Sequence, residues 1–281
     1  MMTRAADKAL PRAAQLNRQA GGQMLSRRAV IVGSLAGGGM AISFFGTQAS
    51  GATVKDEDIS RMNLPFEVMK VRGADALDEL EALERRRQGY PVILGDHEAV
   101  ERLKEGMSVS NKSVDELILL SSDVDPETWF GQRIANDPQY YTPPRGPWPE
   151  DVKPPTSIMG HLDIRTGKPR KEVLVGIIPV AESWKVPCVL KFGGWNECPF
   201  PQEHAAVLKR WNEKYGADVV TVAGDILEMR VKRPPTSRAE ALALAKEQFV
   251  YCSDIVLQGT ETIDALAANL LNSPAWFFWW D

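Results

Sequence analysis

Cysteine, histidine and long apolar runs are scarce in this chain of 281 residues. Three cysteines are too few for a fold held by several disulfide bonds, and the three histidines form no metal-binding pair at helical spacing. Only one apolar stretch approaches the length of a membrane span, which excludes a protein with several spans. Hydrophobic residues at 44% and charged residues at 25% indicate an ordinary globular chain.

Sequence motifs with an established mechanism are missing as well. The run Gly167-Lys168-Pro169 lacks the preceding glycine spacing and the following hydroxyl residue of a phosphate-binding loop. No dinucleotide-binding fingerprint and no nucleophile-elbow pentapeptide is present. No reaction class is therefore indicated by a motif.

Residues 1–52 have the three parts of an export signal. A basic head ends at Arg27-Arg28, an uncharged stretch runs to Gly46, and small residues precede a predicted cleavage after Ala52, with Ala49 as a second position. The paired arginines resemble a twin-arginine signal, the route for proteins exported in the folded state, although Val30 stands where phenylalanine is usual. We expect a periplasmic or secreted protein; the alternative is an uncleaved N-terminal membrane anchor.

The charge changes once this segment is removed. Residues 1–52 hold six basic side chains and one acidic one, which leaves 27 basic and 36 acidic residues and a net charge of -9. An acidic body without a basic stripe argues against nucleic-acid binding. The expected partner is a protein or a small-molecule ligand of unknown identity, and the membrane is contacted only transiently, through the signal segment.

The hydrophobic pattern of residues 53–121 predicts alternating helices and strands. Helices are expected over residues 75–89 and 96–105, and strands over residues 90–94 and 116–120. Residues 122–160 are rich in proline, which predicts a long ordered loop without regular helix or central strand. Its interspersed aromatic residues either anchor the loop or roof a pocket.

Residues 161–281 predict the larger part of the fold. Strands are expected over residues 172–180, 186–192, 218–222, 226–231 and 276–281, and helices over residues 202–215, 237–249 and 262–271. The expected fold class is α+β: residues 53–281 form a single domain with a mixed, largely antiparallel sheet and packed helices.

The second half of the chain also resembles a known family. The residues that carry this resemblance are Val186-Pro187, Gly193-Gly194-Trp195-Asn196, Cys198-Pro199, His204, Trp211, Tyr215-Gly216-Ala217, Asp225, Glu228, Val231, Pro234-Pro235, Glu240-Ala241, Glu247-Gln248, Tyr251-Cys252, Asp254, Gln258-Gly259 and Trp279-Trp280-Asp281. Over residues 173–281 the chain resembles a bacterial family named domain of unknown function 4253. The resemblance implies no activity, because none is assigned to the family.

Cys198, Cys252 and His204 are the candidates for a metal site, because thiolates and an imidazole bind zinc or copper. Their spacing is not a standard ligand spacing and a fourth ligand is not evident, so no cofactor is predicted. The two other interpretations are a disulfide bond between Cys198 and Cys252 and a simple role for both thiols as small buried groups.

Asp225, Glu228 and His204 are the candidates for general acid–base catalysis. Asp225 also fits a hairpin turn in which it hydrogen-bonds to its own backbone, and Glu228 fits an ion pair on one face of a strand.

Trp195, Asn196, Gln248, Tyr251 and Gln258 are the candidates for ligand binding, because Trp195 and Asn196 follow a Gly-Gly pair and the other three supply hydrogen-bonding groups. A buried polar network is the competing interpretation. We expect a non-enzymatic binding domain. The alternative is a hydrolase-like enzyme that uses the acidic residues and His204 beneath the proline-rich loop.

Overall fold

The computed structural model describes residue 59 and residues 62–281, and these residues build one six-stranded sheet. The strand order is β1-β3-β2-β4-β5-β6, and every neighbouring pair is antiparallel except β2 and β4. The strands are β1 (Glu67–Val71), β2 (Tyr90–Gly95), β3 (Val173–Ile178), β4 (Ala217–Ala223), β5 (Ile226–Val231) and β6 (Ala275–Trp279). The predicted α+β class with a mixed, mostly antiparallel sheet is confirmed.

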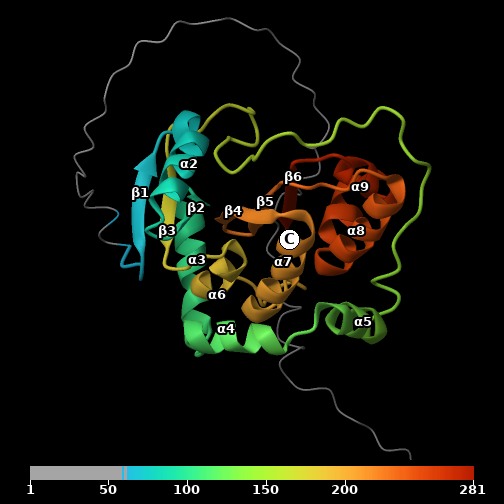
Figure 1. Ribbon diagram of the computed structural model, residues 1–281, viewed down its shortest axis with the longest axis horizontal. Helices are drawn as coiled ribbons and strands as arrows, with labels where there is room; N and C mark the ends of the chain where they lie inside the picture. The colour runs from blue at the N-terminus through green and yellow to red at the C-terminus, as the bar shows by residue number, and fades with distance from the viewer. Residues whose placement is uncertain (1–58, 60–61) are drawn as a thin grey trace, which may run out of the picture.

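Helices surround this sheet (Figure 1). The α-helices are α2 (Ala76–Arg86), α3 (His97–Val109), α4 (Val114–Asp123), α5 (Pro126–Asn136), α6 (Val186–Leu190), α7 (Pro201–Tyr215), α8 (Arg238–Tyr251) and α9 (Ile263–Leu270). Two short 3₁₀ helices, η2 (Gly73–Asp75) and η3 (Ser183–Lys185), and one π-helix, η4 (Ile255–Thr260), complete the described elements.

The two faces of the sheet bury cores of unequal size. Leu227 and Met229 of β5 join the large core beneath α7, α8 and α9. Val173 and Val175 of β3 join a smaller core with α2 on the other face. Successive side chains of a strand point to opposite faces, so the alternation along each strand decides which core a residue enters.

Several predicted elements are confirmed together with the signals that set their ends. Asp96 caps α3 by accepting a hydrogen bond from the Ala99 backbone N–H at 3.0 Å, and Ser237 and Glu240 form the capping box at the start of α8. Gly216 ends α7 with a positive φ of 60°. The hairpin of β4 and β5, α9 and the aromatic strand β6 also lie where the pattern placed them.

Two predicted strands are wrong, because both are helices. Residues 116–120 lie in α4, which begins at a capping box of Ser113 and Glu116, and its apolar run divides into a buried Leu117 and a Leu119 that is 69% exposed. Residues 186–192 contain α6, a short helix whose apolar side chains are buried on all sides. A short, fully apolar run has no period that distinguishes a strand from a buried helix.

The prediction that the proline-rich region lacks regular helix is also wrong at its beginning. Pro126 is the first residue of α5, where its missing N–H is not needed, and Asp125 caps the helix by accepting from the Thr128 N–H at 2.8 Å. From residue 137 to residue 172 the chain forms no helix or strand longer than an isolated bridge. Figure 1 shows this segment passing from α5 around α8 and α9 to the far end of the sheet.

Two sets of polar contacts hold residues 137–172 against the rest of the domain. Arg145 forms a two-pronged ion pair with Asp264 at the start of α9, with Nε–Oδ2 and Nη2–Oδ1 distances of 2.8 Å. Glu228 of β5 accepts hydrogen bonds from the backbone N–H groups of Met159, at 2.6 Å, and Gly160, at 2.8 Å. The segment is therefore ordered by polar contacts with the sheet and with α9.

The predicted signal, Arg27 and Arg28 and the cleavage position after Ala52 lie outside the described residues. Within the part of the chain that the structure describes, no helix has the length and apolar character needed to cross a bilayer.

Candidate functional site

His204 lies at the centre of a buried group of polar and aromatic side chains. It occupies the first turn of α7 and has no exposed surface. Its Nδ1 atom is 2.5 Å from the Tyr251 hydroxyl at the end of α8, and its Nε2 atom is 3.3 Å from the Cys198 thiol. Both ring nitrogens of His204 are therefore engaged within the protein.

Aromatic rings enclose this hydrogen-bonded chain. Phe192 and Trp280 lie with their ring centroids 5.2 and 5.4 Å from the His204 ring. We call His204, Tyr251, Cys198, Phe192 and Trp280 the His204 cluster. It joins the loop before α7, the end of α8 and the end of the chain.

The cluster is electrically neutral at neutral pH. Burial, with a smaller contribution from the positive charge of Arg133, lowers the pKa of His204 to about 3. Burial also raises the pKa of the Cys198 thiol and of the Tyr251 hydroxyl well above their ordinary values. Without an ionised thiolate, Cys198 is a poor nucleophile and a poor metal ligand.

The Gly-Gly pair explains how the loop from Lys191 to Phe200 reaches this position. Gly193 has a φ of 109°, and a Cβ atom there would lie 1.9 Å from the Pro199 carbonyl oxygen and 2.8 Å from His204 Nε2. The Gly194 N–H donates to the carbonyl oxygens of Cys198, at 3.2 Å, and Pro199, at 3.0 Å. A side chain at position 193 is thus incompatible with this loop.

A second polar group lies beside the cluster, at the end of α5. Arg133 Nη2 donates to the Glu197 carbonyl oxygen at 2.8 Å and to its carboxylate Oε2 at 3.4 Å, and the Tyr141 hydroxyl donates to the same Oε2 at 3.1 Å. The guanidinium carbon of Arg133 lies over the rings of Trp129 and Tyr141, 4.9 and 5.2 Å from their centroids.

Sequence reasoning missed Arg133 and Tyr141, because 64 and 56 residues separate them from Glu197. The only local signal is the spacing of Trp129 and Arg133, four residues apart on α5, which has meaning only once α5 is known to be a helix.

The remaining proposed ligand residues lie around the same region. The ring centroids of Trp195 and Phe192 lie 5.1 Å apart, while Asn196 is exposed at the tip of the loop. Gln258 lies in the π-helix η4 and donates to Asp254 Oδ1 at 3.1 Å. Gln248 is buried in α8, and its Nε2 atom has no hydrogen-bond partner among the described residues. π-Helical turns are frequent at functional sites, so η4 adds to the interest of this region.

Glu228 and Asp225 lie away from the His204 cluster. Leu227 and Met229 of β5 enter the core beneath α7, so Glu228 between them points to the opposite face, where both carboxylate oxygens accept backbone N–H groups. Asp225 lies in the turn of the hairpin, and its carbonyl oxygen accepts from the Trp280 N–H at 3.2 Å. The structure brings together His204 and the two cysteine-bearing segments, but it does not bring Glu228 into contact with His204.

The three cysteines are buried and free of disulfide bonds. Cys252 donates its thiol hydrogen to the Trp279 carbonyl oxygen at 2.9 Å, whereas the Cys198 thiol faces His204. No group of three His, Cys, Asp or Glu side chains is suitably placed for a metal ion among the residues that the structure describes.

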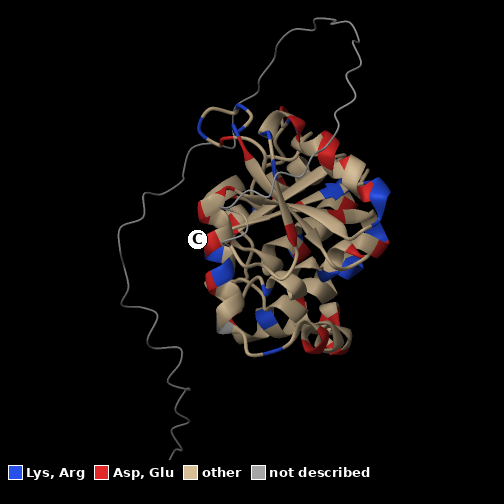
Figure 2. Ribbon diagram, turned by 90° about the vertical axis from the view of Figure 1, so that its left-hand side faces the viewer, with Lys and Arg blue, Asp and Glu red and all other residues tan. Residues whose placement is uncertain are grey.

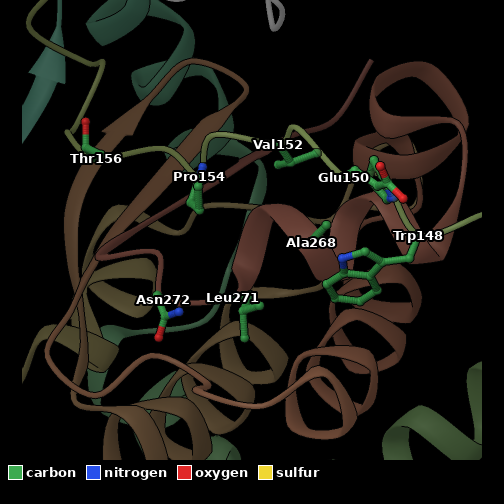
Figure 3. A pocket seen from close by; sticks show the side chains of 9 residues that line it. Trp148, Glu150, Val152, Pro154, Thr156, Ala268, Leu271 and Asn272 are labelled. Carbon is green, nitrogen blue, oxygen red and sulfur yellow. The ribbon is translucent and has the colours of Figure 1, made fainter.

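A groove of about 450 Å³ lies on another part of the molecule, between residues 148–156 and the end of α9 (Figure 3). Its lining combines apolar side chains with a few polar ones: Trp148, Pro149, Glu150, Val152, Pro154, Thr156, Ala268, Leu271 and Asn272. Arg238 lies over the ring of Trp148, with its guanidinium carbon 4.6 Å from the ring centroid. The proline-rich segment thus borders a groove, although none of the proposed catalytic residues lines it.

Basic and acidic positions are interspersed along the described ribbon. In the view of Figure 2, Lys and Arg positions and Asp and Glu positions both occur on several helices.

Comparison with known proteins finds a similarity over the C-terminal part of the chain. Residues 174–281 match the family model described as domain of unknown function (DUF4253). No curated protein matches the chain, and no solved structure matches it.

Proposed function

We propose that residues 62–281 act as a non-enzymatic binding domain whose ligand is a small, mainly apolar molecule held in the groove between residues 148–156 and α9. An enzyme needs ionisable side chains gathered in an accessible cleft, whereas a binding domain needs a concave apolar surface. The contrast between the groove and the His204 cluster supports the second description.

The chemistry of the His204 cluster carries this proposal. His204 is fully buried, both of its ring nitrogens are engaged, and burial holds its pKa at about 3. A general base that works near neutral pH needs a pKa in that range and contact with the substrate. The side chain therefore suits a structural role better than proton transfer.

The groove supplies the surface that a binding domain requires. Its volume of about 450 Å³ falls in the range of small-molecule sites, roughly 300–1,000 Å³. Trp148, Val152 and Leu271 give apolar contacts, and Thr156 and Asn272 offer hydrogen bonds. Glu150 is the one charged side chain of its lining, which disfavours an anionic ligand in this groove.

Titration with the neutral apolar dye Nile red tests the proposal. We expect saturable binding to the wild-type chain, weakened at least about tenfold in a Thr156→Trp variant that fills the groove. A Ser122→Trp variant, which adds an exposed ring on α4, is the matched control and keeps wild-type affinity. Absence of saturable binding, or equal binding by both variants, contradicts the proposed groove.

A hydrolase assay tests the non-enzymatic part. We expect no turnover of chromogenic esters, phosphates or peptides above the level of a His204→Gln variant. Turnover by the wild-type chain that this variant loses, while its circular dichroism stays unchanged, would support an enzyme instead.

We also propose that the protein is exported through a twin-arginine signal, on the strength of Arg27-Arg28, the uncharged stretch after them and the small residues before Thr53. Intact mass of the protein from the extracytoplasmic fraction is expected to fit a chain that begins at Thr53. Lysine at both arginine positions should leave full-length protein in the cytoplasm. Recovery of full-length wild-type protein from the cytoplasm alone contradicts export.

A further inference from the structure

Arg133 is a partly buried arginine that uses few of its hydrogen-bond donors within the described part of the chain. Its side chain is 17% exposed, and its Nε atom is buried without a partner in the described part of the chain. A guanidinium group carries five N–H donors, and among the described residues only those of Nη2 have an acceptor, which is Glu197. A buried donor without a partner is unfavourable, so the site has free capacity for an acceptor.

The contact with the Glu197 carboxylate is loose by the standards of this same protein. Arg133 Nη2 reaches Glu197 Oε2 at 3.4 Å, and the Glu197 side chain is 61% exposed. Arg145, by contrast, holds both oxygens of Asp264 at 2.8 Å, and the Asp264 side chain is 7% exposed. The Arg145–Asp264 contact therefore has the geometry of a stable bidentate ion pair, whereas the Arg133–Glu197 contact has that of a weaker pair that a ligand can replace.

The rest of the site is held ready for an acceptor. The guanidinium carbon of Arg133 lies 4.9 Å from the ring centroid of Trp129 and 5.2 Å from that of Tyr141, so both rings help to hold the guanidinium in place. The Tyr141 hydroxyl donates to the same carboxylate oxygen as Arg133 does. Arg133 Nη2 and the Tyr141 hydroxyl thus already converge on a carboxylate oxygen, as two donors for a bound carboxylate would.

The exposure of Glu197 also favours exchange. Because 61% of its side chain is exposed, the carboxylate can be hydrated once it leaves Arg133, so its displacement does not strand a buried charge.

We propose that Arg133 and Tyr141 form a binding site for the carboxylate of a small organic acid, and that the Glu197 side chain is its built-in, exchangeable occupant. The site goes beyond the proposed apolar groove, because it lies on α5 and the loop before α7 and takes a ligand of opposite character. A ligand there displaces the Glu197 carboxylate but leaves the hydrogen bond from Arg133 to the Glu197 carbonyl oxygen in place.

Benzoate is the probe, with benzamide as its uncharged counterpart and inorganic phosphate as an anion of different shape. Binding is followed by the ¹⁵N NMR signal of Arg133 Nε and by calorimetry. A Glu197→Ala variant is expected to bind benzoate at least about tenfold more tightly than the wild type, because the internal competitor is gone. Glu182→Ala, which removes an exposed acid from an ion pair with Lys185, is the matched control and leaves the affinity unchanged.

Two further variants test the donors on the Glu197→Ala background. Arg133→Lys keeps the charge but loses the planar fork, and Tyr141→Phe loses the hydroxyl; we expect about tenfold and several-fold weaker binding. Benzamide should not bind, and phosphate should bind more weakly than benzoate. The carboxylate site is overturned if the Glu197→Ala chain binds benzoate no more tightly than the chain that carries both Glu197→Ala and Arg133→Lys. It is also overturned if phosphate binds as tightly as benzoate.

The outcome is independent of the groove. Failure of benzoate binding with saturable Nile red binding removes the carboxylate site alone, and the reverse result removes the apolar groove alone.

Discussion

The His204 ring and the Tyr251 hydroxyl form a hydrogen bond of 2.5 Å that joins α7 to α8 where neither residue has any exposed surface. A Tyr251→Phe substitution keeps the ring contacts but leaves His204 Nδ1 without its partner. We expect the free energy of unfolding to fall by about 1–3 kcal/mol, the cost of an unsatisfied buried polar atom. Urea denaturation followed by circular dichroism measures the change.

Tyr140→Phe is the matched control for that substitution. Tyr140 makes a similar hydrogen bond, with its hydroxyl 2.7 Å from Ser253 Oγ, but it is only half-buried and water can replace the partner. The expected loss is below about 1 kcal/mol. An equal loss in both variants would mean that burial of the His204 pair adds nothing.

Stability should rise with pH because of His204. Burial lowers its pKa to about 3 in the folded chain, against about 6.5 when the chain is unfolded. Between these values the unfolded chain binds the proton, so the contribution of His204 is fully present above about pH 6.5 and is lost as the pH falls toward 3.

Through His204, the free energy of unfolding should change by at most about 1.4 kcal/mol per pH unit. Urea midpoints measured across this interval should depend less on pH in His204→Gln than in His97→Gln, which changes an exposed histidine at the start of α3. NMR provides a direct reading: a ring signal of His204 that titrates near pH 6.5 contradicts the assignment.

Alanine at position 193 should disrupt the loop before α7. The new Cβ atom would lie 1.9 Å from the Pro199 carbonyl oxygen, and the φ of 109° is unfavourable for any side chain. We expect a loss of more than about 3 kcal/mol or a chain that does not accumulate. In Gly131→Ala, where nothing lies within 4 Å, the same added methyl group should instead stabilise α5 by about 0.5–1 kcal/mol.

Glu228→Gln should loosen the segment around Gly160. The amide group of glutamine places an N–H donor against one of the two backbone N–H groups that the carboxylate now accepts. A loss of about 1–3 kcal/mol follows from the unsatisfied donor. Faster proteolytic cleavage within residues 156–172 is the local measurement, and a cleavage rate equal to that of the exposed variant Glu150→Gln would contradict it.

Arg145→Ala should remove the ion pair that holds the chain at position 145 to the start of α9. The largely buried Asp264 carboxylate then loses both guanidinium donors and keeps the Gly146 N–H, at 3.0 Å. We expect a loss of about 1–3 kcal/mol and faster proteolysis near residue 145. Arg85→Ala removes an arginine from an exposed ion pair with Glu81 and should change stability by less than about 0.5 kcal/mol.

Elements with a clear period or end signal could be predicted from the sequence. The capping box of Ser237 and Glu240, the cap at Asp96 and the glycine that ends α7 all act through neighbours within four residues. The strands at 116–120 and 186–192 could not be excluded by apolar character alone, because α6 is buried on all sides and the apolar run of α4 continues onto its exposed face at Leu119. Ser113 and Glu116 carried the missing signal for α4.

The candidate site could be predicted only in part. The loop around Trp195 and Asn196 and its neighbours His204, Tyr251 and Cys252 were chosen from their residue types, and the fold brings them together. Arg133 was not predicted as a site residue, because it lies in α5, where the proline-rich sequence predicted a loop and not a helix. Its contact with Glu197 is a property of tertiary packing, which no local pattern encodes.

The position of β2 has a consequence for how the chain folds. β2 lies between β3 and β4, although β3 follows it by 78 residues and β4 by more than 120. The centre of the sheet therefore closes only after most of the chain has left the ribosome, and its pairings have high contact order, which slows folding. A fragment of residues 174–281 lacks β2, which pairs with both β3 and β4. The facing edges of β3 and β4 would then be unpaired, so we expect the fragment to aggregate through these edges.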